Sequence, residues 1–215
     1  MFVRPCWLPT SPHDAIEIID QHPWALMVSN GAEVPFATNL PLLLDHSRLD
    51  VREGRAVLVG HIARGNEHAR ILALPNTKVL AIFEGPWSYV TAGWYPRRDM
   101  PSTYYYTAVH CTGTIKLQDE PALDASLEDL VQRSEANYTK GWRTDEIPRS
   151  EITRRFAGIV GFRIHVDRIE AKFKLGQDEP LKDALSVAEN LERQASPADH
   201  AEAALIRKHN QDRTL

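Results

Sequence analysis

The alternation of apolar and polar residues along this chain is mostly that of short strands. Runs of strand length, rich in β-branched and aromatic residues, recur between proline and glycine turns. Asn30-Gly31 is a hairpin signal, and Pro41 inside the following run indicates an edge strand or a bulge. We predict strands at Trp24–Ser29, Pro35–Leu44, Ala56–His61, Lys78–Glu84, Ser88–Ala92, Tyr104–Gln118 and Ile159–Ile169.

Helical spacing of apolar residues occurs at fewer places, mostly towards the two ends of the chain. Asp124 is the expected N-cap of the helix at Pro121–Gln132, with Leu127, Leu130 and Val131 on its inner face. The other predicted helical segments are Asp14–Gln21, Asn66–Leu72, Ser150–Phe156, Leu181–Gln194 and an amphipathic tail after Ser196. Strands at the centre and helices at the periphery predict a mainly β (α+β) antiparallel sheet or barrel. We expect one domain, 1–215, with an N-terminal helix at about 12–22 and a C-terminal helical extension at about 181–215.

Composition narrows the class of protein without naming a function. The chain has 215 residues, 43% hydrophobic content and a net charge of -4, which is typical of a soluble domain. No cluster of lysine and arginine suggests direct nucleic-acid binding, and no glycine-rich signature indicates a Rossmann or P-loop fold. Cys6, Cys111 and the nine histidines show no metal-ligand spacing, so we expect no metal. The absence of a signal core or a membrane-length apolar run predicts a cytoplasmic protein.

Candidate chemistry lies where three of the predicted strands end. Gly60–Asn66 can aim the side chains of Arg64 and Asn66 at an oxyanion, although a solvated surface turn is about as good an explanation. The segment after Phe83 combines rings and hydroxyls at Tyr89, Thr91, Trp94 and Tyr95, as a ligand wall would. A phosphorylated aromatic cofactor would use both kinds of group.

The run Thr103-Tyr104-Tyr105-Tyr106 must divide its side chains between two faces of a strand. Tyr104 and Tyr106 face one way, so at least one tyrosine lies on an exposed or interfacial side. A tyrosine-rich dimer interface is the alternative interpretation, and it is compatible with function. Lys172 and Lys174 likewise share one face, where a solvated edge strand with protective lysines is the alternative.

These segments together resemble a known family. Gly-His-Ile-Ala-Arg-Gly-Asn at Gly60–Asn66, Phe-Glu-Gly-Pro-Trp-Ser-Tyr-Val at Phe83–Val90 with Trp94-Tyr95, and Lys-Phe-Lys-Leu-Gly-Gln at Lys172–Gln177 are similar to motifs of the PaiB family. Its members are described as FMN-binding negative transcriptional regulators. The resemblance implies an FMN-binding split β-barrel with peripheral helices. It also implies a homodimer with FMN in a groove between subunits.

The resemblance also implies roles for individual residues. His61, Arg64 and Asn66 would hold the phosphate side of FMN. The residues that would line the flavin or come from the C-terminal strand are Tyr89, Thr91, Trp94, Thr103, Lys172, Lys174 and Gln177. Asn39 stands where the family usually has histidine, and Thr103–Tyr106 replaces Thr-Trp-Asn-Tyr. Both changes fall where cofactor or substrate should lie, which indicates a divergent member.

Three functions are compatible with this sequence. The favoured one is a flavin-linked small-molecule oxidoreductase, with NADH or NADPH as a candidate electron donor. Tyr104, Tyr105 and Tyr106 would shape its substrate side, one phenol acting as general acid and His110 or His61 as base. Arg97 and Arg98 would clamp a carboxylate of the substrate, unless their loop is a solvated turn. The alternatives are a transcriptional regulator or sensor of the PaiB type, and an enzyme that has lost flavin and catalyses a redox-neutral reaction.

Overall fold

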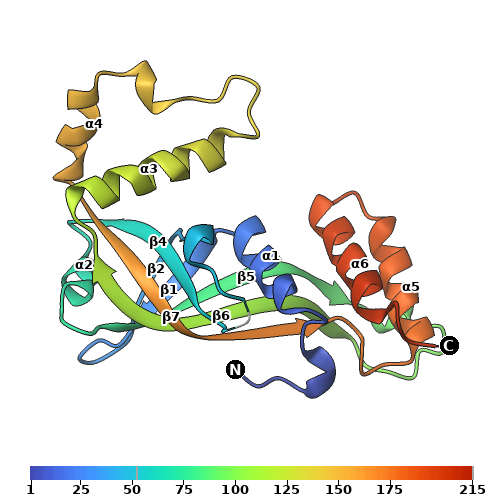
Figure 1. Ribbon diagram of the computed structural model, residues 1–215. Coiled ribbons are helices and arrows are strands. Elements are labelled where there is room, and N and C mark those ends of the chain that lie inside the picture. The colour runs from blue at the N-terminus through green and yellow to red at the C-terminus, as the bar shows by residue number, and fades with distance from the viewer. Residues whose placement is uncertain (52, 215) are drawn as a thin grey trace. The chain divides into compact units, whose positions relative to one another are not determined.

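The chain folds into seven strands and six α-helices in a computed structural model, which describes residues 1–51 and 53–214 (Figure 1). Residue 215, the last of the predicted helical extension, lies outside this range. The strands are β1 (Trp24–Ser29), β2 (Phe36–Pro41), β3 (Leu43–Leu44), β4 (Ala56–Ala63), β5 (Lys78–Val90), β6 (Thr103–Leu117) and β7 (Ile159–Lys174). The helices are α1 (Pro12–Gln21), α2 (Glu67–Leu72), α3 (Glu120–Glu135), α4 (Arg149–Phe156), α5 (Leu181–Glu192) and α6 (Pro197–Asn210).

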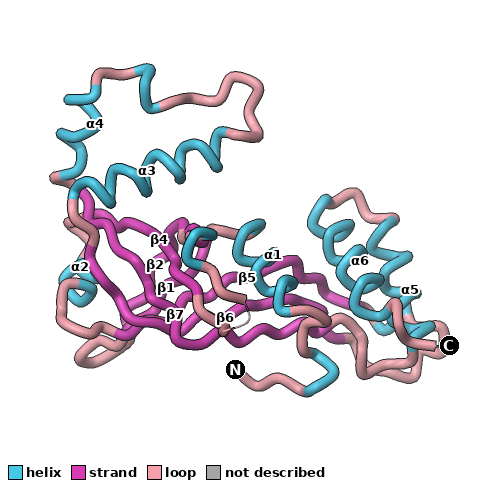
Figure 2. Tube along the Cα trace, in the orientation of Figure 1, coloured by secondary structure: helices cyan, strands magenta, loops and turns pink. Residues whose placement is uncertain are grey.

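The strands form one antiparallel sheet with the order β2-β1-β5-β6-β7-β4-β3, which is a split β-barrel (Figure 2). Hairpin pairing sets Trp24 of β1 opposite Pro41 of β2, and β2 lies at the edge of the sheet. A proline fits there because an edge strand leaves one row of N–H groups unused. The predicted fold class and the edge position of this strand are confirmed. In the described part of the chain, no helix has the length and apolarity needed to cross a bilayer.

Contacts divide the chain into two compact units, to which β5, β6 and β7 each contribute residues. The first unit comprises Met1–His22, Phe83–His110 and Glu170–Leu215. Its core includes the fully buried Phe83, Tyr105 and Phe173. Helices α5 and α6 pack against each other (Figure 1). These helices match the predicted C-terminal extension, and α1 matches the predicted N-terminal helix.

The second unit comprises Pro23–Ile82 and Cys111–Ile169. Strand β4 pairs with β7 in a register that sets His61 opposite Gly161, and Phe162 and Ile164 are fully buried. Gly113 of β6 must be glycine, because a Cβ there would lie 2.5 Å from the carbonyl oxygen of His165. The prediction of a strand running through Gly113 is therefore confirmed, and it has a steric reason.

Some predicted boundaries, and the predicted inner face of one helix, were wrong. Gly85-Pro86 does not interrupt β5, because Gly85 occupies a place where a Cβ would meet the Thr107 side chain. The N-cap of α3 is Asp119, whose Oδ1 accepts from the Ala122 N–H at 3.0 Å, whereas Asp124 pairs with Arg149. In α3 the buried side chain is that of Leu123. The expected inner residues Leu127, Leu130 and Val131 are only half-buried.

Candidate functional site

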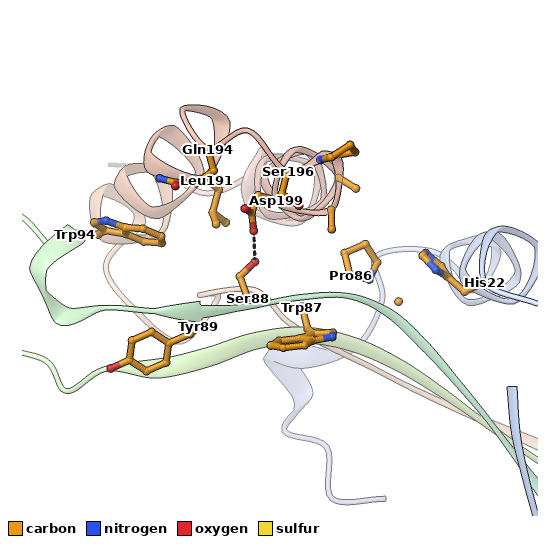
Figure 3. Close-up of a pocket in the computed structure, with 14 residues that line it drawn as sticks. His22, Pro86, Trp87, Ser88, Tyr89, Trp94, Leu191, Gln194, Ser196 and Asp199 are labelled. Carbon is orange, nitrogen blue, oxygen red and sulfur yellow. Dashed lines mark hydrogen bonds between the residues drawn. The ribbon is translucent and has the colours of Figure 1, made fainter. Parts of the chain in front are cut away.

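Three aromatic side chains of the first unit form an exposed patch on one face of its sheet. Trp87 and Tyr89 alternate along β5 with the buried Ser88. Figure 3 shows the Ser88 side chain on one side of the strand and the Trp87 and Tyr89 side chains on the other. The Tyr104 ring of β6 lies 6.2 Å from the Trp87 ring and 5.4 Å from the Tyr89 ring, centroid to centroid. Their exposed fractions are 60% for Trp87 and 53% for each tyrosine. We call Trp87, Tyr89 and Tyr104 the aromatic patch; grouped exposed rings are typical of a ligand site or an interface.

A nearly buried lysine lies beside the next outward tyrosine. Tyr106 shares the face of Tyr104 by alternation along β6. The Nζ of Lys172 lies 5.0 Å from the Tyr106 ring centroid, 4.7 Å from that of Trp7 and 5.9 Å from that of Phe2. Lys172 is 8% exposed, and its contacts in the described part of the chain are with rings rather than with a carboxylate. Cation–π contacts stabilise such a charge, but they leave its hydrogen bonds available to an anion.

Lys174 lies two residues further along β7 and is tied to β6. Its Nζ donates to Thr103 Oγ1 at 2.5 Å and to the Tyr104 carbonyl oxygen at 2.8 Å. Burial lowers the pKa of Lys174. Thr103 therefore helps to fix this ammonium group beside the backbone of Tyr104. The structure thus brings Tyr89, Thr103, Tyr104, Tyr106, Lys172 and Lys174, all predicted site residues, into one unit.

Tyr105 lies on the opposite face of β6 and is fully buried. Its hydroxyl donates to Glu179 Oε2, and the Tyr95 hydroxyl donates to Glu179 Oε1 at 3.2 Å. Burial raises the pKa of Tyr105, and the hydrogen bond to Glu179 raises it further. A phenol held in this way has no free proton to give to a substrate. Tyr105 therefore supports the core here, although the sequence placed it with the catalytic tyrosines.

His110 is the predicted base that lies on the outward face of β6, three alternations from Tyr104. Its side chain is half-buried. Burial lowers the pKa of His110, and the positive N-terminus lowers it further. A histidine with a lowered pKa is neutral at pH 7, which is the form that accepts a proton.

The predicted residues between β5 and β6 serve their own loop. Thr91 Oγ1 accepts from the Gly93 N–H at 3.2 Å, which caps a short 3-10 turn. Arg97 pairs with Asp99 at 3.3 Å, and Arg98 has a φ of 54°. Both arginines are exposed. Their role as a substrate clamp stays a prediction.

Gln177 closes the turn after β7. Its Nε2 donates to the Phe173 carbonyl at 2.7 Å, and its Oε1 accepts from the Leu175 N–H at 2.8 Å. Both ends of this amide are therefore engaged by the backbone of its own turn. Gly176 within the turn has a φ of 81°, which favours glycine.

The predicted phosphate-side residues belong to the second unit. Arg64 donates from Nε to the Ala157 carbonyl and from Nη2 to the Ile159 carbonyl, both at 2.8 Å. Asn66 is the N-cap of α2, where its Oδ1 accepts from the His68 N–H at 3.0 Å. Arg64 thus binds the backbone between α4 and β7, and Asn66 binds that of α2, so a phosphate contact by either stays a prediction.

The two other predicted residues of this unit are more available. Asn39 is exposed on the edge strand β2, opposite Leu26 of β1. His61 is half-buried on β4, and burial lowers the pKa of its imidazole. Ligand contact by either residue stays a prediction.

Sequence reasoning missed two buried polar residues that organise these units. In the second unit, His68 lies with Nε2 2.8 Å from Ser29 Oγ and with Nδ1 2.9 Å from Thr38 Oγ1. In the first unit, Glu179 binds two tyrosines. Neither residue stands out by spacing, since the partners of each are distant in sequence.

Comparison with known proteins decides the family. A family model described as "Putative FMN-binding domain" matches residues 1–168. The chain belongs to this family. A Bacillus subtilis protein named "Protease synthase and sporulation protein PAI 2" is 26% identical over 197 residues, which is 92% of each chain. An uncharacterised protein of Emericella nidulans is 25% identical over 210 residues, covering 84% of this chain and 82% of its own. The PaiB resemblance is confirmed.

Solved structures agree on the fold. The FAD and heme binding protein from Mycobacterium smegmatis has a TM-score of 0.58 at 20% identity, covering 78% of this chain and 73% of its own. A flavocytochrome from Azotobacter vinelandii has a TM-score of 0.56 at 16% identity, covering 88% and 72%. At these identities the likeness shows the split-barrel fold.

The cofactor of this family is FMN, and the groups of the first unit suit it. Its flat ring needs aromatic walls, which the aromatic patch offers, and its dianionic phosphate needs fixed cations. Lys172 is a nearly buried lysine that, among the described residues, contacts rings and forms no ion pair. An anionic group bound beside this ammonium group would supply the negative charge that pairs with it. The residues therefore fit the group.

Proposed function

We propose that this protein is an FMN-dependent oxidoreductase acting on a small molecule at the outward sheet face of the first unit. The observation that carries the proposal is the ammonium group of Lys172, which lies beside the outward-facing Tyr106 and forms no ion pair with the described residues. A solvated edge strand would expose such a lysine fully, whereas this one is 8% exposed. The net charge of the chain is -4, so its overall composition does not indicate this local positive charge.

The residues would divide the work by chemical type. Tyr89 and Tyr104 of the aromatic patch would flank the flavin ring, while Lys172 and Lys174 would attract its anionic groups. When bound, FMN supplies hydride or oxygen chemistry to the site. The neutral imidazole of His110 would accept a proton from substrate, and the Tyr106 hydroxyl would orient it.

We also propose that the protein works as a homodimer. The aromatic patch exposes three rings by more than half, and a second copy of the chain would cover them. Aromatic residues are enriched at the cores of such interfaces. Multi-angle light scattering at micromolar concentration tests this proposal, and a monomeric mass contradicts it.

Anaerobic spectroscopy tests the catalytic proposal. The protein is reconstituted with FMN, and NADH, NADPH or dithionite is then added in separate samples. Bleaching of the flavin band by a nicotinamide, followed by its return with oxygen, supports an oxidoreductase. A band that responds to dithionite alone contradicts the use of a nicotinamide donor.

A regulator is the second candidate, supported by the name of the Bacillus subtilis relative, which refers to protease synthesis and sporulation. In that role the flavin or another small ligand would be sensed rather than turned over. The net charge of -4 favours sensing over direct contact with DNA. A gel shift at low salt with DNA from its own promoter region distinguishes the two roles.

A further inference from the structure

A cavity of about 780 Å³ lies in the first unit between β5 and the ends of α5 and α6 (Figure 3). This volume is within the range of small-molecule sites, roughly 300–1,000 Å³. The side chain of Ser88 points into it, whereas Trp87 and Tyr89 extend to the other side of the strand. Trp87 and Tyr89 also border the cavity along β5, but its central polar group is Ser88, whose side chain lies on the opposite side of the strand from their rings.

Its lining is apolar except for a few well-placed groups. Leu191, Pro86 and the indole of Trp94 supply hydrophobic surface. At the centre, Ser88 Oγ donates to Asp199 Oδ1 at 3.1 Å. Figure 3 shows this pair facing across the cavity from β5 to α6. Such a pair fixes the carboxylate in place.

The charge of the lining is negative. Asp199 is its one carboxylate, and none of the described residues that line it is lysine or arginine. Burial lowers the pKa of His22, so this lining histidine is neutral at pH 7 and adds no positive charge. Asp199 lies in the first turn of α6, where the helix end carries about half a positive charge. A full negative charge exceeds that half charge, so the cavity retains a net attraction for cations.

A second carboxyl group lies one turn along α6, at Glu202. Glu202 is fully buried, and neither oxygen has a hydrogen-bond partner among the described residues. Residues three apart on a helix are neighbours, and the charge of Asp199 helps to raise the pKa of Glu202. With a pKa of about 8, Glu202 is mainly protonated at pH 7, so Asp199 supplies the negative charge of this part of the unit.

We propose that this cavity binds a small organic ammonium ion, with the cation at Asp199 and its apolar part against Trp94 and Leu191. The indole adds to the attraction, because a ring face favours a cation. The test of this site needs no FMN.

Isothermal titration calorimetry at pH 7 tests the site with three matched probes. These are 2-phenylethylamine, the neutral 2-phenylethanol and the anionic 3-phenylpropionate. We expect saturable one-to-one binding of the amine, with the neutral and anionic probes at least roughly tenfold weaker. Equal binding of the three probes, or no saturable binding of the amine up to about 10 mM, overturns the proposal.

Two variants locate the binding in the chain. Asp199→Asn keeps the size of the side chain and an acceptor for Ser88, and should weaken amine binding by roughly tenfold or more. Glu189→Gln removes the same charge from an exposed position on α5 and should leave the affinity unchanged. Equal affinities of wild type and Asp199→Asn, with folding verified by circular dichroism, overturn the assignment.

Discussion

Replacing Glu202 with glutamine should remove a large pH dependence from the stability of this protein. Glu202 is fully buried on α6 without a hydrogen-bond partner among the described residues. Burial raises the pKa of this carboxyl from 4.5 to about 8, with a further contribution from Asp199. Glutamine has nearly the same shape but carries no charge at any pH.

The expected magnitude follows from the pKa values of the two states. Because the folded pKa exceeds the unfolded one, the folded state binds the proton more tightly. The stabilisation is complete below pH 4.5 and is lost as the pH rises through about 8. At about 1.4 kcal/mol per pH unit, this gap corresponds to about 5 kcal/mol of unfolding free energy. That is a large part of the roughly 5–15 kcal/mol available to a domain.

Urea denaturation followed by circular dichroism at pH 5, 6, 7 and 8 measures this effect. The free energy of unfolding of Glu202→Gln minus that of wild type should be small at pH 5 and should grow by about 4 kcal/mol by pH 8. Titration of the histidines contributes equally to both proteins, so it does not affect this difference. Glu189→Gln, an exposed carboxylate on α5, should show a flat difference. Parallel curves for wild type and Glu202→Gln would refute the reasoning.

Three further predictions concern the core, the aromatic patch and the thiols. Tyr105→Phe should lower the free energy of unfolding by about 1.5–3 kcal/mol, because it removes a hydrogen bond to the buried carboxylate of Glu179; urea denaturation checks this, and an unchanged midpoint contradicts it. Tyr104→Glu should convert the proposed dimer to a monomer in light scattering, because it places a charge in the aromatic patch, and a retained dimer mass would exclude this interface. Burial raises the pKa of Cys111 to about 12 while Cys6 is exposed, so a disulfide reagent at pH 8 should modify one thiol in the native protein and two after unfolding; rapid modification of both native thiols would contradict the burial.

Much of the sheet could be predicted because strand alternation is a local property. The predicted strand at Trp24–Ser29 matches β1 residue for residue, and Pro41 correctly indicated an edge. A turn was wrongly predicted at Gly85-Pro86, because glycine favours turns but also occurs in strands where another chain segment packs closely. The requirement at Gly85 comes from Thr107, which is on another strand.

The candidate site was less predictable because its chemistry depends on distant partners. Alternation correctly placed Tyr104 and Tyr106 on one face, but it could not show that Glu179, 74 residues away, binds the Tyr105 hydroxyl. The surroundings of Lys172 include Trp7 from the N-terminal segment, which no spacing rule connects to β7. Residue types therefore indicated the kind of ligand, while the contacts decided which residues are free to meet it.

An FMN titration of wild type and Lys172→Met tests the central claim most directly. Methionine keeps an unbranched stem among the rings and removes the charged ammonium group. Lys182→Met on α5 is the control for the same loss at an exposed position. Quenching of flavin fluorescence should saturate for wild type and for the control. It should require roughly 10- to 100-fold more protein for Lys172→Met, as expected for a lost charged hydrogen bond. Equal affinity of Lys172→Met and wild type, or no quenching by either, would contradict a flavin site at this face.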